Sequence, residues 1–436
     1  MARYAEPGAR GSVVTYRDRY DHFIGGEHVP PAEGGYFADR TPVTGEVFTE
    51  VARGTAEDVD RALDAAHGAA RRWGRTSTAE RAHVLNEIAD RVEDHVDALA
   101  VAETWDTGAP VRESLADVPR AVDCFRHFAA LIRVQEGGVS TLGDDLVAHH
   151  FREPLGVVDR LVPWRSPLLT AAANLAPALA AGNTAVLRPA ERAPAAVHVL
   201  VGLIADLLPP GVVNVVNGVG GDEPPVGRGT DVFFADVAAR RDAFYDRALE
   251  GFATFALDRA LVQSPIHDRF LSDATERARA AEQGHPLDTR TAVGALAGRD
   301  QLDRTMSLIE VAERDGARVL CGGRPADLGG ELSGGHYLEP TVVVGESRVS
   351  RSDLVGPVVW VTAFDHFDDA VKELAGAADG VGLWSREAGV GFRAGRRVAA
   401  RRVRVNTFRS GSGHEDHRAL LDQYQRTKTI LVEQGG

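Results

Sequence analysis

The stretch VPWRSPLLTAAANLAPALAAGNTAVLRPAE, residues 162–191, decides the fold of this chain. Its apolar middle, residues 166–182, has the alanine and leucine content of a buried helix, and Gly182 gives that helix a natural end. The runs GVVDRLVP at 156–163 and TAVLRP at 184–189 are short, β-branched and typical of strands. Strand, helix and strand in this order predict a parallel sheet covered by helices.

The same alternation extends toward both ends of the chain. A helix is predicted over residues 193–211 and a strand over 212–218, and two long amphipathic helices are predicted upstream, over 55–74 and 78–105. Downstream, helical and strand-like runs between residues 243 and 380 predict a second α/β unit. The closing run KTILVE, residues 428–433, alternates like a strand and has no partner nearby in the sequence.

The composition disfavours several classes of function. With 436 residues the chain has room for more than one domain, and its formal charge of −14 disfavours a nucleic-acid partner. No apolar run has the length of a membrane helix or a secretion signal, so we expect a cytoplasmic protein. Cys124 and Cys321 lie far apart in apolar contexts and are expected to be small core residues without a disulfide or a zinc site. His414 and His417 in the run HEDH are a weak metal candidate, because short acidic loops are usually solvated, and we expect no metal site.

Several motifs occur in an order that matches one known family. PW at 163–164, APALAAGNT at 176–184, RPAE at 188–191 and PPGVVNVVNG at 209–218 resemble the aldehyde dehydrogenase superfamily in sequence and spacing. FIGGEHV, ETWDTGAP, REPLGVV, GPVVWV, VNTF and QYQRTKTILVE extend the resemblance over nearly the whole chain. The properties of that family are therefore expectations for this chain.

The resemblance implies an α/β fold of three parts. Residues 1–137 and 156–248 would form a truncated cofactor domain of the variant Rossmann type, and residues 249–421 a second α/β domain of the catalytic type. Residues 138–155 and 422–436 would form a small bridging sheet that joins subunits into dimers or tetramers. In that sheet the closing strand would pair with the hairpin that ends near Arg152.

The resemblance also shows substitutions at the catalytic positions. Family members oxidise aldehydes through a cysteine thiolate, which is intrinsically nucleophilic near neutral pH. Counting back from Arg259 places Thr254 at that position, and a Thr hydroxyl would need a strong adjacent base. Arg165 stands where the family has an oxyanion-donating Asn, and residues 219–233 are too short to contain the turn that bears the general base.

The positions that contact the cofactor in the family are altered as well. Arg188 replaces a Lys that contacts ribose hydroxyls, Glu191 matches a Glu that selects NAD or NADP, and Trp164 belongs to the PW motif. Asp353 replaces the Glu that grips the nicotinamide ribose and is shorter by about one methylene, ~1.5 Å. Residues 219–233 also leave no room for the glycine-rich turn that holds the pyrophosphate. We therefore expect these positions to be vestigial and NAD(P) to bind without ordinary affinity.

The leading functional prediction is a non-catalytic structural or regulatory subunit that has lost NAD-dependent aldehyde oxidation. It would form a homo-oligomer or accompany an active aldehyde dehydrogenase paralogue. One alternative is a repurposed enzyme that uses the old substrate tunnel for different chemistry, with Arg165 as an anion clamp and Thr254 or Asp353 as participants. The other alternative is a divergent NAD(P)-dependent aldehyde dehydrogenase.

Overall fold

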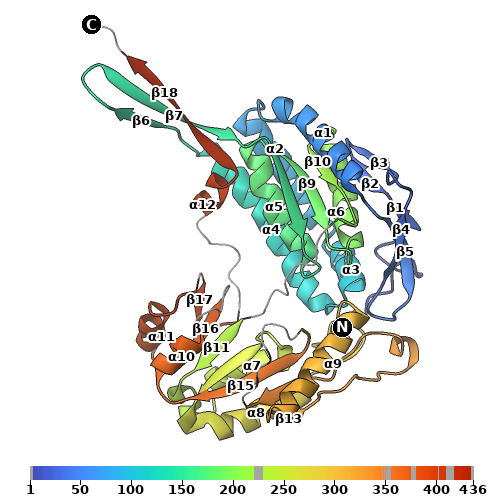
Figure 1. Cartoon of the computed structure of the whole chain (residues 1–436), viewed down its shortest axis with the longest axis vertical. Helices are drawn as coiled ribbons and strands as arrows, with labels where there is room; N and C mark the ends of the chain where they lie inside the picture. The colour runs from blue at the N-terminus through green and yellow to red at the C-terminus, as the bar shows by residue number, and fades with distance from the viewer. Residues whose placement is uncertain are drawn as a thin grey trace.

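The computed structural model describes residues 3–219, 229–345, 347, 349, 355–374, 380–400, 402–408 and 417–433. These residues form two lobes, each with its own central sheet, and a three-stranded projection that extends away from both (Figure 1). The first lobe holds mainly the N-terminal half of the chain, and the second holds most of the remainder. The predicted α/β fold is confirmed.

The central sheet of the first lobe has five strands in the order β3-β2-β10-β9-β8. The last three are parallel, and a hairpin from the N-terminal region adds antiparallel to β10. Helices join the parallel strands as the alternation in residues 156–218 predicted. Within the described residues β8 is an edge strand of this sheet. The elements are β2 (His22–Ile24), β3 (Glu27–Val29), β8 (Val157–Val162), α5 (Pro167–Ala181), β9 (Thr184–Pro189), α6 (Ala195–Ile204) and β10 (Val213–Val215).

Further helices and a small sheet complete the first lobe. Helices α2 and α4 pack against each other and against α5. No helix in the described ranges is both long enough and apolar enough to cross a membrane. These elements are β1 (Arg19–Tyr20), β4 (Tyr36–Arg40), β5 (Val47–Ala52), α1 (Ala56–Trp73), α2 (Thr78–Glu93), α3 (Val96–Thr107) and α4 (Val111–Arg133).

The prediction of one continuous helix over residues 78–105 is wrong. The structure has two helices there, α2 and α3, with a break at Asp94 and His95. His95 Nδ1 lies 2.8 Å from the carbonyl oxygen of Arg91, so its ring satisfies an acceptor at the end of α2. Most of α3 is buried, whereas α2 buries one face only. Both helices have apolar residues to bury, so the apolar pattern continues from α2 into α3 and does not show the turn between them.

The sheet of the second lobe has seven strands in the order β13-β14-β15-β12-β11-β16-β17. All neighbours are parallel except β13 and β14. The strands are β11 (Thr230–Phe233), β12 (Arg259–Gln263), β13 (Arg318–Cys321), β14 (Thr341–Val344), β15 (Val358–Phe364), β16 (Val381–Trp384) and β17 (Val403–Val405). The helices are α7 (Ala243–Thr254), α8 (His267–Arg279), α9 (Arg299–Arg314), α10 (Phe367–Glu373) and α11 (Ala388–Gly395).

The domain boundary expected at residue 248 is wrong. β11 lies inside the second sheet, between β12 and β16, and α7 packs in the core of the same lobe. The chain therefore leaves the first lobe before Thr230. The resemblance to a longer family placed this stretch with the first lobe, whereas the short connection after β10 brings it directly to the second.

Residues from the C-terminal half complete the core of the first lobe. Leu287 and Tyr337 are buried in its hydrophobic cluster, as are Leu421 and Tyr424 near the end of the chain. The hydroxyl of Tyr337 also donates to the carbonyl oxygen of Val43 at 3.0 Å. The two lobes are therefore packed together rather than joined only by the chain.

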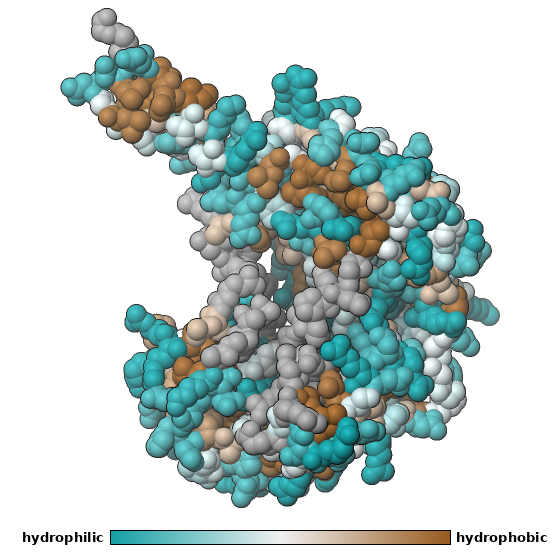
Figure 2. All heavy atoms as spheres, viewed as in Figure 1, coloured by the Kyte–Doolittle hydropathy of each residue, from teal (hydrophilic) through white to brown (hydrophobic). Residues whose placement is uncertain are grey.

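The projection is an antiparallel sheet of β6 (Gly138–Thr141), β7 (Leu146–Pro154) and β18 (Gln425–Glu433), which follows α12 (His417–Asp422). β18 pairs with β7 along its whole length, so the predicted pairing of the closing strand with this hairpin is confirmed. The register puts β-branched and aromatic side chains on one face, and Figure 2 shows apolar atoms gathered at the tip. The exposed members of this face are Val139, Phe151, Ile430 and Val432.

Candidate active site

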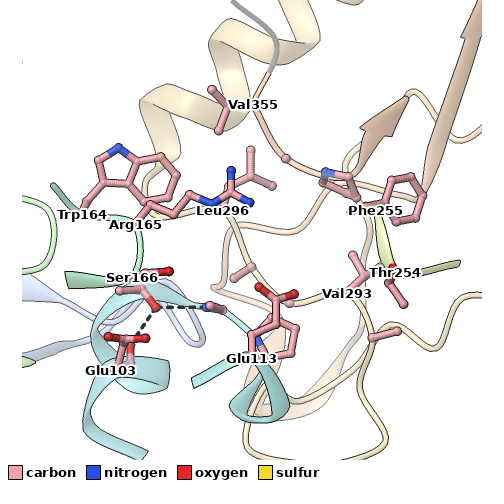
Figure 3. Close-up of a pocket in the computed structure, with 18 of the residues that line it drawn as sticks. Glu103, Glu113, Trp164, Arg165, Ser166, Thr254, Phe255, Val293, Leu296 and Val355 are labelled. Carbon is pink, nitrogen blue, oxygen red and sulfur yellow. Dashed lines mark hydrogen bonds between the residues drawn. The ribbon is translucent and has the colours of Figure 1, made fainter. Parts of the chain in front are cut away.

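A cleft between the two lobes encloses about 960 Å³, including space open to solvent (Figure 3). The first lobe contributes the turn between α3 and α4 and the turn between β8 and α5. The second lobe contributes the end of α7 together with residues 292–296 and 355–357. Loops at the ends of several elements therefore meet here, as they do in many enzyme active sites.

The structure brings three predicted site residues into this cleft. Trp164 and Arg165 follow β8, and Thr254 is the last residue of α7. In Figure 3 the Arg165 side chain reaches into the cleft, and Thr254 lies across from it. The Thr254 hydroxyl donates to the carbonyl oxygen of Glu250 at 3.0 Å. No described side-chain base bonds to this hydroxyl, so nothing in the described cleft activates it as a nucleophile.

Two residues beside these positions have a strained backbone. Ser166 and Phe255 have φ of 46° and 51°, in the left-handed region that side chains rarely adopt. Phe255 ends α7 at Thr254, and Ser166 precedes the first residue of α5. Such conformations cost roughly 1–3 kcal/mol each and cluster at functional sites. The strain lies on both walls of one cleft, which supports its choice as the candidate site.

Neither cysteine of the chain lines the cleft. Cys124 lies in α4 and Cys321 in β13, and both are free, half-buried and packed against hydrophobic clusters. Burial raises the pKa of both thiols, which makes them less reactive. Because the chain has two cysteines in all, the cleft holds no thiol.

Glu103 is the most deeply buried acidic group of the cleft. It belongs to α3, is 3% exposed, and its Oε2 accepts the backbone N–H of Leu168 at 3.0 Å. Burial raises the pKa of its carboxyl group to about 8, although the Leu168 N–H acts in the opposite direction. Glu103 is therefore protonated at neutral pH.

Three further carboxyl groups line the cleft, and the sequence analysis did not select them. Glu113 and Asp117 lie four residues apart on one face of α4, and Asp258 follows α7. Asp117 pairs with Arg120 at 2.8 Å, and Asp258 accepts the N–H of Gly229 at 3.3 Å. Among the described residues Glu113 has no such partner, and Figure 3 shows its carboxylate pointing into the cleft. No signal in the sequence distinguishes these three carboxyl groups from other acidic residues of the chain.

The predicted cofactor residues Arg188 and Glu191 do not line the cleft. Arg188 on β9 holds the carboxylate of Asp159 with two contacts, of 2.7 and 2.8 Å. Glu191 lies 3.4 Å from the guanidinium of Arg53. The charged side chains of Arg188 and Glu191 thus both form ion pairs within the first lobe.

Some predicted features lie outside the described residues. Asp353, residues 220–228 of the shortened connection and His414 of the HEDH run belong to this group. His417 begins α12, but the structure does not describe its side chain. The roles expected for these residues stay predictions.

A separate group of metal-ligating residue types lies away from the cleft. Glu6, His285 and Glu331 bring ligand atoms within 4.8 Å of one another. His285 Nδ1 accepts the N–H of Leu287 at 3.1 Å, so the ring proton sits on Nε2, which then has no lone pair for a metal. Arg3 donates to Glu6 at 2.9 Å and to Glu331 at 2.5 Å. The group is an ion-pair cluster, and the expectation of no metal site stays a prediction.

Comparisons with known sequences agree with this architecture. The family model described as aldehyde dehydrogenase family matches residues 28–224 and 238–430. Fluoroacetaldehyde dehydrogenase of Streptantibioticus cattleyicolor is 48% identical over 499 residues, covering 99% of this chain and 98% of the relative. Acetaldehyde dehydrogenase 2 of Cupriavidus necator is 45% identical over 496 residues, covering 98% and 97%. Since this chain has 436 residues, these relatives contain stretches that it lacks.

Solved structures give the same result at the level of the fold. HpcC from Thermus thermophilus superposes with a TM-score of 0.86 at 32% identity, over 96% of this chain and 94% of that one. PnpE in complex with nicotinamide adenine dinucleotide superposes with a TM-score of 0.87 at 28% identity, over 96% and 98%. The fold of this chain is thus shared with proteins of known structure.

Proposed function

This chain belongs to the aldehyde dehydrogenase family, and we propose that it is a divergent member that acts on aldehydes by acid–base chemistry rather than through a thiol. The family model matches most of the chain and relatives are named for aldehydes, which supports a small aldehyde as ligand. The observation that carries the proposal is the content of the cleft. It combines a guanidinium group, carboxyl groups and a strained backbone with no cysteine.

The cleft offers groups suited to the addition of water to a carbonyl group. The Glu113 carboxylate is the candidate base, taking a proton from water as the water oxygen bonds to the carbonyl carbon. The Arg165 guanidinium is the candidate electrophile, stabilising the negative charge that moves to the carbonyl oxygen. Return of the proton from Glu113 to that oxygen gives the hydrate, and on an ester the same addition leads to hydrolysis. No oxidant is consumed in either case.

A divergent NAD(P)-dependent aldehyde dehydrogenase is the second candidate, favoured by the solved relative that holds nicotinamide adenine dinucleotide. The described residues do not fit the cofactor as the family would hold it. Arg188 already forms an ion pair with Asp159. The first sheet ends at β8, and the described residues contain no further parallel strand beside β8 that would lead into a helix N-terminus able to bind a pyrophosphate. We therefore derive no step through NAD(P), and weak cofactor binding stays a prediction.

Two experiments separate these candidates. Calorimetric titration with NAD and with NADP tests the cofactor, and a dissociation constant in the low micromolar range would favour the second candidate. Hydrolysis of p-nitrophenyl acetate, together with exchange of the acetaldehyde oxygen with labelled water, tests the first. We expect Arg165→Met and Glu113→Gln to lose this activity, while Glu276→Gln, on the exposed surface of α8, retains it. Equal activity in all three variants would contradict the proposal.

We also propose that the chain self-associates through the projection, because an exposed apolar sheet face is rarely left uncovered. Because the cleft holds no thiol, a non-catalytic subunit that accompanies an active aldehyde dehydrogenase paralogue is a further candidate role for this chain. Co-purification from the native host distinguishes the two, since a homo-oligomer would carry this chain alone.

A further inference from the structure

The start of the chain lies where the two lobes meet (Figure 1). The backbone N–H of Tyr4 donates to the carbonyl oxygen of Leu287 at 3.0 Å. The hydroxyl of the same tyrosine donates to the carboxylate of Asp97 on α3 at 2.9 Å. Residues 3–6, which we call the strap, therefore contact a helix of the first lobe and a turn from the C-terminal half of the chain at the same time.

Ion pairs reinforce the attachment of the strap. Arg3 donates to Glu331 at 2.5 Å and to Glu6 at 2.9 Å, so its guanidinium group lies between two carboxylates. His285 Nε2 lies 3.5 Å from Glu6, and burial lowers the pKa of the His285 ring to about 4, so this ring is neutral at neutral pH. The Arg3, Glu6 and Glu331 side chains are partly exposed, and water therefore screens their charges. Each pair contributes modestly, and the attachment depends on their combination.

The turn at residues 284–291 connects the strap to the wall of the cleft. The hydroxyl of Thr291 closes this turn by donating to the carbonyl oxygen of His285 at 2.8 Å. The His285 ring also stacks on Trp105 of α3, with ring centroids 6.3 Å apart. Residues 292–296 follow the turn directly and line the cleft. The strap thus holds the turn from which this wall of the cleft begins.

The same part of the chain also fixes the start of α4. Val111 donates its N–H to the carbonyl oxygen of Pro286 at 2.8 Å, and Ala295 donates its N–H to the carbonyl oxygen of Gly108 at 2.9 Å. The two segments approach so closely that a Cβ atom at Gly108 would lie 2.9 Å from the Cβ atom of Ala295. Glu113 lies in the first turn of α4. The turn held by the strap therefore borders both the cleft wall and the helix that carries this carboxylate.

We propose that the strap positions the cleft: residues 3–6 hold the turn at 284–291, and their release loosens residues 292–296 and the start of α4 while both central sheets stay folded. The contacts of the strap go to α3, to this turn and to Glu331, none of which is a strand of a central sheet. Local opening of this kind costs less free energy than global unfolding. The inference goes beyond the proposed function, because it concerns the opening of the cleft and not the reaction inside it.

Hydrogen exchange of the full chain, followed by mass spectrometry, tests this inference. The N–H groups of Val111, Val293 and Ala295 are hydrogen-bonded, so their exchange reports the opening of the cleft wall and of the start of α4. We expect exchange in peptides covering 108–114 and 292–296 to be about fivefold faster in Arg3→Gln and about tenfold faster in Tyr4→Ala, with no change in β12.

Two further variants check which contact is responsible. Arg10→Gln, at an exposed position a few residues after the strap, should leave exchange unchanged. Glu331→Gln should resemble Arg3→Gln, and the double variant should show less than the combined effect of the two, because these side chains form one contact. Purely additive effects would mean that this ion pair does not hold the strap.

The other outcomes are equally decisive. An equal rise of exchange in β12 would mean that the strap supports the whole fold, and unchanged exchange in both wall peptides would mean that it holds neither wall. Either result overturns the inference. Arg3→Gln, at an exposed side chain, carries the test if Tyr4→Ala does not fold. Because exchange is measured without any substrate, the result does not depend on whether the cleft hydrates aldehydes or hydrolyses esters.

Discussion

Burial of the Glu103 carboxyl group makes the stability of the protein depend on pH. Its pKa rises to about 8 from the ordinary value of 4.5, chiefly because the side chain is buried. A raised pKa means that the folded protein holds the proton more tightly than the unfolded chain does. The stability that this group contributes is therefore fully present below pH 4.5 and is lost as the pH rises through about 8.

We expect Glu103→Gln to remove this loss, because glutamine resembles the protonated acid and keeps an acceptor for the Leu168 N–H. In the wild type this loss of stability amounts to roughly 3 kcal/mol between pH 5 and pH 8, and about 1.4 kcal/mol of the contribution is still present at pH 7. Urea unfolding at pH 5, 6, 7 and 8 measures it, with Glu276→Gln as the control. Parallel pH profiles for wild type and Glu103→Gln would show that this carboxyl group is not the source.

The strained backbone at Ser166 can be tested in the same way. With φ of 46°, glycine fits this position better than any residue with a Cβ atom, and the Ser166 side chain makes no helix-capping hydrogen bond that would be lost. We expect Ser166→Gly to be at least as stable as wild type and Ser166→Val to be less stable by ~1–2 kcal/mol. Midpoints of denaturant unfolding measure the stability of each variant. A Ser166→Gly variant less stable than wild type would mean that the Ser166 hydroxyl stabilises the fold by more than the backbone strain destabilises it.

Introducing a thiol at Thr254, the position predicted to match the family's nucleophile, should not recreate the family's chemistry. We expect Thr254→Cys to react with iodoacetamide and to gain at most slow ester hydrolysis. NAD-dependent oxidation also needs a nicotinamide placed within about 1 Å of its working position, and Arg188 is already held by Asp159. NADH absorbance with short aldehydes measures this, and turnover near ~1 per second would show that the cofactor site is intact.

The sequence located part of the site and missed part of it. The order of the motifs was enough to predict that Arg165 and Thr254 share one site, and they lie on opposite walls of the cleft because Arg165 follows the end of β8 and Thr254 ends α7. Glu113 could not be selected, since a Glu in the first turn of a helix is ordinary and its orientation depends on how α4 packs. Arg188 was assigned by its place in a motif, whereas its pairing with Asp159 on the next strand depends on sheet register.

At the scale of helices and strands, the alternation of strands with helices was predicted well, whereas the ends of helices were not. β8, α5, β9, α6 and β10 follow the pattern in residues 156–218, because buried parallel strands and alanine-rich helices have distinct compositions. The helix predicted over 78–105 was wrong because the apolar pattern continues through a turn that His95 helps to form. A local pattern cannot show that two helices diverge when both have apolar residues to bury.

The projection allows a matched test of self-association. Ile430 shares the exposed apolar face with Val139 and Val432, whereas Leu431 points to the opposite face of the same sheet. We expect Ile430→Lys to shift the protein toward monomer and Leu431→Lys to do so much less, since only the first places a charge in the apolar face. Sedimentation velocity at micromolar concentration measures both variants. A wild-type protein that sediments as a monomer would refute association through this face.

At the scale of the whole molecule, sequence reasoning found two α/β units and misplaced the point where the chain passes between them. The resemblance to longer proteins assigned residues up to 248 to the first unit, but β11 joins the second sheet. The length of a connection does not say which sheet receives the next strand, because that depends on pairing with strands later in the chain, here β12 and β16. The participation of Leu287 and Tyr337 in the first lobe was equally invisible, since it joins residues hundreds of positions apart.

The shared core has a consequence for the order in which this protein can fold during synthesis. The strands of the first lobe are complete by Val215, yet its hydrophobic cluster also needs Leu287, Leu421 and Tyr424. At ~10 residues per second a ribosome takes about 20 s to travel from the first of these points to the last. For that time the nascent lobe would keep part of its interior open, so we expect a chain stopped at residue 280 to be protected poorly from protease and a chain stopped at 433 to be protected well. Limited proteolysis of the two chains after their release from the ribosome measures this, and full protection of the shorter one would mean that the lobe closes without its late residues.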